Sequence, residues 1–360
     1  MKTSMSRRKF LSGVAAGASV LAMPAIGKGP IKVQMTQAGV PDGSGMFLYV
    51  AKNKGYFKER GIDISIGRGT GSIAAAQNVA SRNFDFALAA GSAAFLQSAK
   101  GTPLVQLGVA QYDSTMGVAV RRDGGIDSPK DLAGKTLGST VTSGEYPFLD
   151  LWANNVGLDL SQVTRLQLDY QVRNRGLLTK EVDAISAFAG SSIPSLAVQN
   201  VDTKFFPYSR ADLLLYGLSL ITRPDKLKDD RELCKAMTEA MLEGLGFSIR
   251  KPGEALDAFS AEVKEIGMSK SGRRQTEIGF GIYTIMSLDA PELEKGLGWQ
   301  DPESLKKQAD LVMKYAAEEG DTLPDVDQLF TNDFVGNVRL TADEIAAAKK
   351  NFAEYKQYAA

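Results

Sequence analysis

Two stretches of the sequence repeat one plan. FDFALAAGSAAFLQS covers residues 84–98, and VDAISAFAGSSIPSL covers residues 182–196. Each begins with a hydrophobic–Asp–hydrophobic step, continues as an apolar strand, and passes through Ala, Gly and Ser into a helix. The two aspartates, Asp85 and Asp183, lie 183 − 85 = 98 positions apart. The pattern predicts the same strand-to-helix corner twice, although two ordinary corners can also resemble each other by chance.

Short apolar strands and longer helices alternate around both corners. The first cycle of predicted strands covers 31–37, 62–67, 84–90 and 103–110. The second cycle begins after residues 116–123, has predicted strands at 136–140, 164–170 and 182–188, and is completed by 191–200 and 203–209. Strands that alternate with helices predict an α/β fold with mainly parallel sheets covered by helices. The remainder is helical, with Asp301 before Pro302 as a predicted N-cap and Thr341 with Glu344 as a predicted capping box.

The composition narrows the possible functions. The chain has 360 residues, enough for two domains, and 42 basic residues balance 42 acidic ones, so nothing favours nucleic acid. Histidine is absent, which excludes His-dependent catalytic triads and His-ligated metal sites. Cys234, the single cysteine, is expected to be a small buried residue of a helix. We expect a monomer without catalytic residues, metal or other cofactor.

The N-terminus has the layout of an export signal. Arg7 and Arg8 precede a short apolar stretch that ends among small residues, which predicts a twin-arginine signal peptide over residues 1–27 and a periplasmic mature protein. The alternative is a membrane anchor, but the apolar stretch is about half of the roughly 20 residues that span a bilayer.

Four strand-to-helix tips are candidate ligand contacts, because small residues there let a ligand approach unpaired N–H groups of a helix. The candidates are Gly39, Asp42 and Ser44; Ala90, Gly91 and Ser92; Ser139, Thr142, Ser143, Gly144 and Glu145; and Phe188, Ala189, Gly190 and Ser191. The alternative for each corner is that glycine and serine only turn the chain and cap a helix. Asp42 could be a turn former, and Glu145 an exposed acid of a first helical turn.

Two other kinds of segment carry no predicted site. GRGTGS at 67–72 lacks the context of a dinucleotide-binding motif, and no Walker-type string is present. The short basic clusters RRD and RNR are expected to be solvated faces.

Five segments together resemble the substrate-binding proteins of ABC transporters, in the nitrate, sulfonate, taurine and thiamine-precursor (pyrimidine) branch. They are YVAKNKGYFKERGIDISI, VASRNFDFALA, IDSPKDLAGKTLGS, VDAISAFAG and YGLSLITRPD, and GLGWQDPESLKKQADLVMKYA with LFTNDFV is similar to that family's tail. The resemblance implies a type II periplasmic binding protein with two lobes joined by two hinge strands. It places lobe 1 at 28–112 and 217–360, and lobe 2 at 113–216.

The resemblance also implies a solute held between the lobes and delivered to an ABC permease of the inner membrane. Tyr112 and Tyr216 would lie at the hinge, where they contact ligand or only pack. No arginine stands at the four tips, which favours an organic solute, sulfonate- or taurine-like or pyrimidine-like, over nitrate. The first alternative is a periplasmic ligand sensor of the same fold. The second is a pyrimidine-synthase-like enzyme, and the absence of histidine counts against it.

Overall fold

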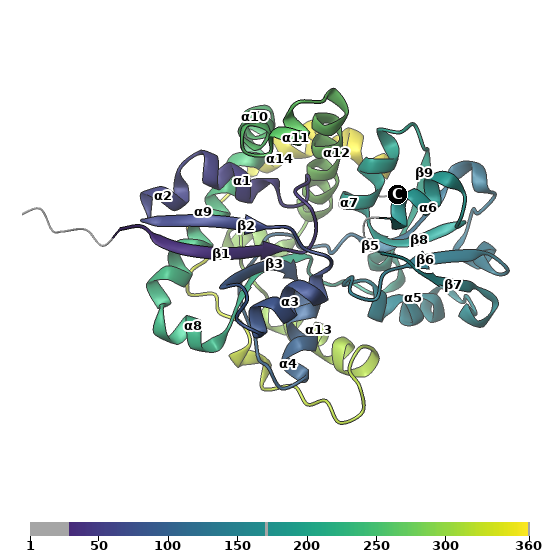
Figure 1. The fold of residues 1–360 in the computed structure, drawn as a ribbon, viewed down its shortest axis with the longest axis horizontal. Coiled ribbons are helices and arrows are strands. Elements are labelled where there is room, and N and C mark those ends of the chain that lie inside the picture. Colours follow the sequence, from purple (N-terminus) through teal and green to yellow (C-terminus); the bar gives the residue numbers. More distant parts are fainter. Residues whose placement is uncertain (1–28, 170–171, 359–360) are drawn as a thin grey trace, which may run out of the picture.

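The computed structural model describes residues 29–169 and 172–358, so the predicted signal peptide lies outside the described residues. Two five-stranded sheets, each flanked by helices, form the two halves of the molecule (Figure 1). The first sheet has the order β2 (Ile62–Gly67), β1 (Ile31–Gln37), β3 (Phe86–Ala90), β10 (Leu218–Thr222), β4 (Val105–Val109). The second has the order β7 (Thr164–Gln167), β6 (Thr136–Ser139), β8 (Ala184–Phe188), β5 (Met116–Arg121), β9 (Thr203–Pro207).

Helices connect the strands and form the C-terminal part. The connecting helices are α1 (Met46–Asn53), α2 (Tyr56–Glu59), α3 (Ser72–Ala80), α4 (Gly91–Ala99), α5 (Leu149–Val156), α6 (Arg173–Thr179) and α7 (Ala189–Ala197). The later ones are α8 (Pro224–Asp229), α9 (Arg231–Arg250), α10 (Pro252–Glu262), α11 (Lys264–Gly267), α12 (Lys270–Ser287), α13 (Pro302–Tyr315) and α14 (Ala342–Asn351). Asp301 caps α13, and the Thr341–Glu344 capping box begins α14, as predicted.

The two sheets share one topology. When β1, β2, β3, β10 and β4 are matched to β6, β7, β8, β5 and β9, the two strand orders become identical. In each sheet one strand runs against its neighbours: β10 pairs antiparallel with β3 and β4, and β5 with β8 and β9. The predicted α/β fold with mainly parallel sheets is therefore confirmed. The antiparallel strands follow from the crossings, because a chain that arrives from the other half enters the sheet from its C-terminal edge.

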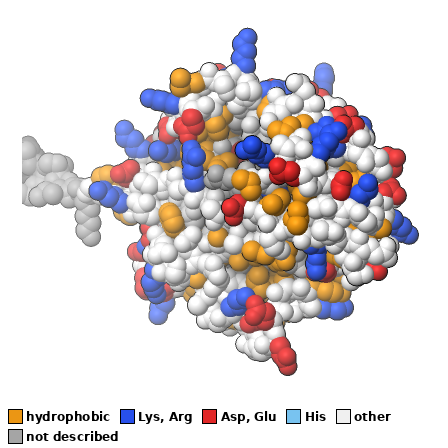
Figure 2. Space-filling model, turned by 45° about the vertical axis from the view of Figure 1, so that its right-hand side comes forward, with side chains coloured by type: hydrophobic (Ala, Val, Ile, Leu, Met, Phe, Trp, Pro, Cys, Tyr) orange, Lys and Arg blue, Asp and Glu red, His pale blue; other side chains and the backbone are white. Residues whose placement is uncertain are grey.

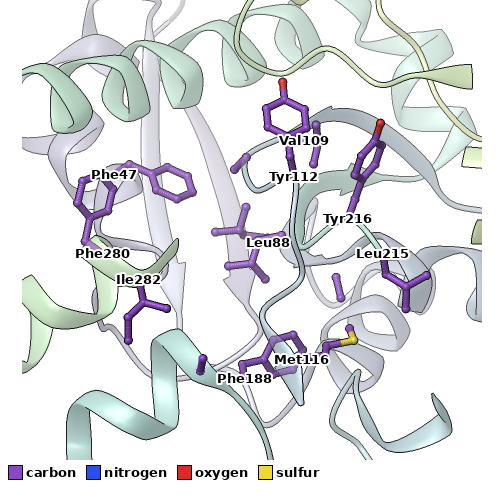
Figure 3. Close-up of a cluster of buried hydrophobic side chains, with 14 of the residues drawn as sticks. Phe47, Leu88, Val109, Tyr112, Met116, Phe188, Leu215, Tyr216, Phe280 and Ile282 are labelled. Atoms are coloured by element: carbon purple, nitrogen blue, oxygen red, sulfur yellow. The ribbon is translucent and has the colours of Figure 1, made fainter. Parts of the chain in front are cut away.

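Two segments, residues 110–115 and 208–217, cross between the sheets and pair with each other. Gly217 N–H donates to Gln111 O over 2.8 Å, and Ser114 N–H donates to Leu215 O over 2.8 Å. Figure 3 shows Tyr112 and Tyr216 side by side on these segments, and Met116 beside Phe188 where the second half begins. Buried apolar side chains of both halves form one continuous cluster around the crossing. The domain boundaries read from the sequence stay a prediction.

The single cysteine, Cys234, is buried in α9, as predicted. Burial raises the pKa of its thiol to about 12.

Among the described residues, no helix combines the length and apolarity needed to cross a bilayer. Figure 2 shows basic and acidic side chains interspersed over one face of the molecule, without a large area of one sign.

Candidate functional site

A narrow cavity lies between the two halves, at the carboxyl ends of their strands. In this structure its cavity volume is about 20 Å³. The lining residues are Gln37, Ala38, Gly39, Val40, Ser44, Gly45, Gly71, Ser72, Leu88, Ser143, Phe188, Ser191, Leu218 and Tyr283. Ser143, Phe188 and Ser191 belong to the second half, so both halves form the wall. None of these lining residues is Asp, Glu, Lys or Arg.

Helix N-termini meet at this cavity. α1 begins after the N-cap Gly45 and α3 after the N-cap Gly71, and both glycines line the wall. Ser191, in the first turn of α7, lines it from the other side. Because the first N–H groups of a helix have no partner within the helix, the cavity offers donors as well as polar side chains.

Glycines allow the halves to close tightly against α12. A Cβ at Gly190 would lie 2.0 Å from Tyr283 Cε2, and a Cβ at Gly43 would lie 2.2 Å from Thr276 O. A Cβ at Gly279, within α12, would lie 2.6 Å from Gly190 O. Since real Cβ contacts are much longer, α7 of the second half and the loop after β1 approach α12 only because glycine stands at these positions.

Two hydrogen bonds bridge the other rim of the cavity. Thr142 Oγ1 donates to Thr70 O over 2.7 Å, and Ile73 N–H donates to Thr142 O over 3.2 Å. Gly71 has a φ of +131°, and a Cβ there would lie 2.1 Å from Thr142 O. The structure is therefore a closed form, with residues 70–73 and 140–143 in direct contact.

The predicted contacts at the second corner lie close to the cavity. Phe188 and Ser191 line it directly. Ala189 and Gly190 are buried between them, and Gly190 faces Tyr283. Gly144 packs at the edge, since a Cβ there would lie 3.3 Å from both Ala90 Cβ and Phe188 Cζ.

The first corner is placed differently. The Ala90 N–H donates to Ser72 Oγ over 3.1 Å, and the Gly91 N–H donates to Gly217 O over 3.1 Å. A Cβ at Gly91 would meet Gln106 Oε1 at 2.5 Å, so this glycine faces the interior of the first half. Ser92 is buried and lies outside the cavity lining. The N–H groups of Ala90 and Gly91 therefore donate hydrogen bonds to other parts of the protein.

In the loop after β1, Gly39 and Ser44 line the cavity, whereas Asp42 lies behind it. Asp42 is 6% exposed, and its Oδ1 accepts from Ser44 N–H over 2.8 Å and from Ser44 Oγ over 2.5 Å. The side chain of Ser191, from the other half, also lies close enough to this carboxyl group to lower its pKa. Burial raises the pKa of Asp42, and the serine donors lower it in part.

Among the candidates at 139–145, only Ser143 lines the cavity. Ser139 is buried at the end of β6, and Thr142 forms the rim contact. Glu145 is 0% exposed: Arg173 Nη1 donates to its Oε1 over 2.5 Å, and the Ser143 hydroxyl donates to its Oε2. Glu145 is thus neither an exposed acid nor part of the wall.

The prediction that the RNR cluster is a solvated face is wrong for Arg173, which is 1% exposed. Its guanidinium group compensates the buried Glu145 carboxylate, an arrangement that one sequence does not reveal. Neither hinge tyrosine lines the cavity, although Tyr112 lines an adjoining pocket that shares Ser44 and Tyr283 with it. Tyr112 OH accepts from Gly298 N–H over 3.1 Å, and Tyr216 OH donates to Glu292 Oε1 over 2.5 Å. Their rings meet edge to face at 5.9 Å.

Several wall residues were not predicted. Gln37 ends β1, and its Nε2 donates to Tyr49 OH over 3.1 Å, which leaves Oε1 on the side of Gly45. Tyr283 comes from α12, far along the chain from every other wall residue. In sequence, both resemble ordinary core positions. No group of three or more His, Cys, Asp or Glu residues suited to a metal ion occurs within 29–169 and 172–358.

Two sheets joined by paired crossing segments, with a cavity walled by both, define a two-lobed solute-binding fold. Residues 44–255 match the family described as NMT1/THI5 like, and the chain belongs to that family. This confirms the resemblance seen in the sequence.

Named proteins similar to this chain agree with that placement. A Haemophilus influenzae protein named after thiamine biosynthesis is 25% identical over 261 residues, 72% of this chain and 80% of that protein. The formylaminopyrimidine-binding protein of Halalkalibacterium halodurans is 26% identical over 221 residues, 61% of this chain and 67% of that protein. The structure of the alkanesulfonate-binding protein SsuA from Xanthomonas axonopodis pv. citri, bound to MOPS, is 15% identical and has a TM-score of 0.63. It covers 85% of this chain and 99% of that one, and at this identity the likeness concerns the fold.

Proposed function

We propose that this protein is the extracytoplasmic solute-binding component of an ABC importer. It captures a small organic solute in the cavity between its two halves and delivers it to a permease of the inner membrane. The observation that carries the proposal is the wall itself: Ser44 and Gly71 stand on one side, and Ser143 and Ser191 on the other. A solute between them gains both sets of contacts only in the closed form, so binding shifts the population toward closure.

The composition of the wall favours an organic solute over a small bare anion. Leu88, Phe188 and Leu218 supply apolar surface, while serine, glutamine and tyrosine supply polar groups. A nitrate or sulfonate ion would find no lysine or arginine in this lining. A pyrimidine-like solute can stack on Phe188 and exchange hydrogen bonds with the serines. The name of the Halalkalibacterium relative supports this solute class.

Export by a twin-arginine signal over residues 1–27 and a periplasmic location belong to the same proposal, because a solute-binding component meets its solute outside the cytoplasm. The alternative of a periplasmic sensor uses the same closure with a different partner. Co-purification with the permease after crosslinking in solute-loaded membranes distinguishes the two: an importer component is captured by the permease, and a sensor is not.

The direct test is to identify the solute that the protein binds. We expect mass spectrometry of the mature protein purified from its host to detect a bound organic solute, and we expect that solute to raise the melting temperature. The panel for the unloaded protein contains a formylaminopyrimidine, taurine, ethanesulfonate and nitrate. If none is retained and none shifts the melting temperature, the proposal is wrong.

A further inference from the structure

Two buried carboxylates, one from each half, stand directly behind the hydroxyl groups of the cavity. Asp42 is 6% exposed and Glu145 is 0% exposed. Ser44 donates to Asp42, and Ser143 donates to Glu145. Ser191 lies beside the Asp42 carboxyl group from the other half. These three serines come from different segments, yet each lines the cavity and has a buried acid beside it.

A hydroxyl group has one proton and two lone pairs. An ionised carboxylate only accepts hydrogen bonds, so a serine paired with one gives up its proton to that bond and keeps its lone pairs for another partner. Beyond the serine donors, Asp42 accepts the Ser44 N–H over 2.8 Å, and Glu145 is balanced by Arg173 over 2.5 Å. Both acids are therefore held in place independently of any solute.

We propose that Asp42 and Glu145 are positioning residues that fix the hydroxyl protons of Ser44, Ser191 and Ser143, so that these three oxygens meet the solute as hydrogen-bond acceptors. This inference rests on the proposed function, and it deepens it. The solute that fits carries N–H or O–H donors toward the serines. In a solute such as a sulfonate, all polar atoms are acceptors. Their lone pairs would face the lone pairs of the serine oxygens, so binding of such a solute is disfavoured.

The first test compares two probes by calorimetry: a formylaminopyrimidine, which has N–H donors, and ethanesulfonate, which has only acceptors. Asp42→Asn keeps the side-chain shape but adds an N–H₂ donor, which frees the Ser44 proton to turn toward the cavity. We expect the affinity for the pyrimidine to fall about tenfold and the preference for it over ethanesulfonate to fall by at least the same factor. Wild-type protein that prefers ethanesulfonate, or an Asp42→Asn variant with an unchanged preference, overturns the proposal.

A matched control separates this effect from the loss of any buried aspartate. Asp113 also accepts a backbone N–H, from Thr115 over 2.8 Å, and has a serine, Ser209, beside its carboxyl group, but it lies outside the cavity lining. Asp113→Asn is expected to leave the ratio of the two affinities unchanged, even if it alters closure. An equal change of the ratio in both variants counts against a local role of Asp42.

The second test needs no solute, so it remains decisive if the proposed function fails. The carboxyl group of Asp42 is titrated by carbon NMR in the unloaded protein. Ser44→Ala or Ser191→Ala removes a donor that stabilises the ionised form, so each is expected to raise the pKa of Asp42. Ser139→Ala is the control, because Ser139 is also buried but its hydroxyl has no partner among the described residues.

The serine substitutions leave the other ionisable groups near Asp42 in place. Arg173 and Arg175 border the groove that Asp42 reaches from outside the cavity, and Tyr49 lies near its charge. If the pKa of Asp42 does not rise in either serine variant, the hydroxyl protons are not held by this carboxylate. The proposal is then wrong, whatever the protein binds.

Discussion

Asp85 and Asp183 make the same pair of hydrogen bonds in the two halves of the molecule. Asp85 N–H donates to Gln34 O over 2.8 Å, and Asp85 Oδ2 accepts from Gln34 N–H over 3.0 Å. Asp183 N–H donates to Thr136 O over 2.9 Å, and Asp183 Oδ2 accepts from Thr136 N–H over 2.9 Å. Each aspartate thus ties the start of the central strand, β3 or β8, to the neighbouring β1 or β6. The repeated sequence motif is a repeated strand anchor.

Removing either anchor is expected to lower the free energy of unfolding. Asp183→Ala loses a charged acceptor of a strand N–H group, which costs about 1–2 kcal/mol. Asp85→Ala is expected to cost somewhat more, because Lys226 Nζ also lies 3.2 Å from its carboxylate. Urea unfolding measures both values. Since the two sites lie in different sheets, the double variant should show the sum, and a large departure from additivity would contradict independent anchors.

Gly190→Ala is expected to impair closure. The new Cβ would lie 2.0 Å from the Tyr283 ring, so α7 and α12 would have to separate. Because the solute gains contacts from both halves only when they close, we expect the affinity for the co-purified solute to drop more than tenfold. Gly253→Ala in α10 is the matched control, since a Cβ there meets no atom within 4 Å. Equal affinity in the Gly190 variant and the control would show that this approach is not needed for binding.

The buried pair of Glu145 and Arg173 predicts an asymmetric response to mutation. Arg173→Met leaves an uncompensated carboxylate in a site that is 0% exposed, which is expected to cost about 3–5 kcal/mol. The double variant Glu145→Gln with Arg173→Met removes both charges and should recover much of that loss. Thermal unfolding monitored by circular dichroism gives the comparison. A double variant less stable than Arg173→Met alone would refute the compensation.

The pH dependence of stability carries a signature of Asp42. Burial raises its pKa above the ordinary value of 3.8, which the unfolded chain retains. Between these two values the folded protein holds a proton that the unfolded chain has released, so Asp42 makes stability fall as the pH rises through that window. Asp42→Asn lacks this term. We therefore expect the difference in melting temperature, variant minus wild type, to increase as the pH rises from the ordinary pKa of 3.8 toward neutral pH.

A difference that stays flat, or that decreases with pH, would show that Asp42 is not a penalised buried acid. Asp131→Asn serves as the control with the opposite sign, because hydrogen bonds from Ser128 lower the pKa of Asp131. For that variant the difference is expected to become more negative as the pH rises.

Local patterns determined much of the fold, and the sequence therefore predicted it. Alternating strands and helices, the Thr341–Glu344 capping box and the Asp301 cap all depend on neighbours within a few residues. The antiparallel direction of β5 and β10 was not predicted, because it depends on the edge from which a crossing chain enters a sheet. No local pattern encodes that.

The wall residues that the sequence singled out lie at the end of β8 or in the segments that follow β1, β6 and β8. They are Gly39, Ser44, Ser143, Phe188 and Ser191. Gln37 and Tyr283 were missed because they look like core residues until α12 is packed against α7. Glu145 could not be assigned from the sequence, since its environment depends on Arg173, 28 residues further on.

Because the chain crosses between the two halves, the two sheets become complete at different times during synthesis. All five strands of the second sheet lie between Met116 and Pro207, so that sheet is complete once this stretch has left the ribosome. The first sheet lacks its fourth strand until Leu218–Thr222 arrives, and β4 has no strand partner before then. The half that begins the chain is therefore the last to mature, and until then β3 and β4 each have an edge without its strand partner.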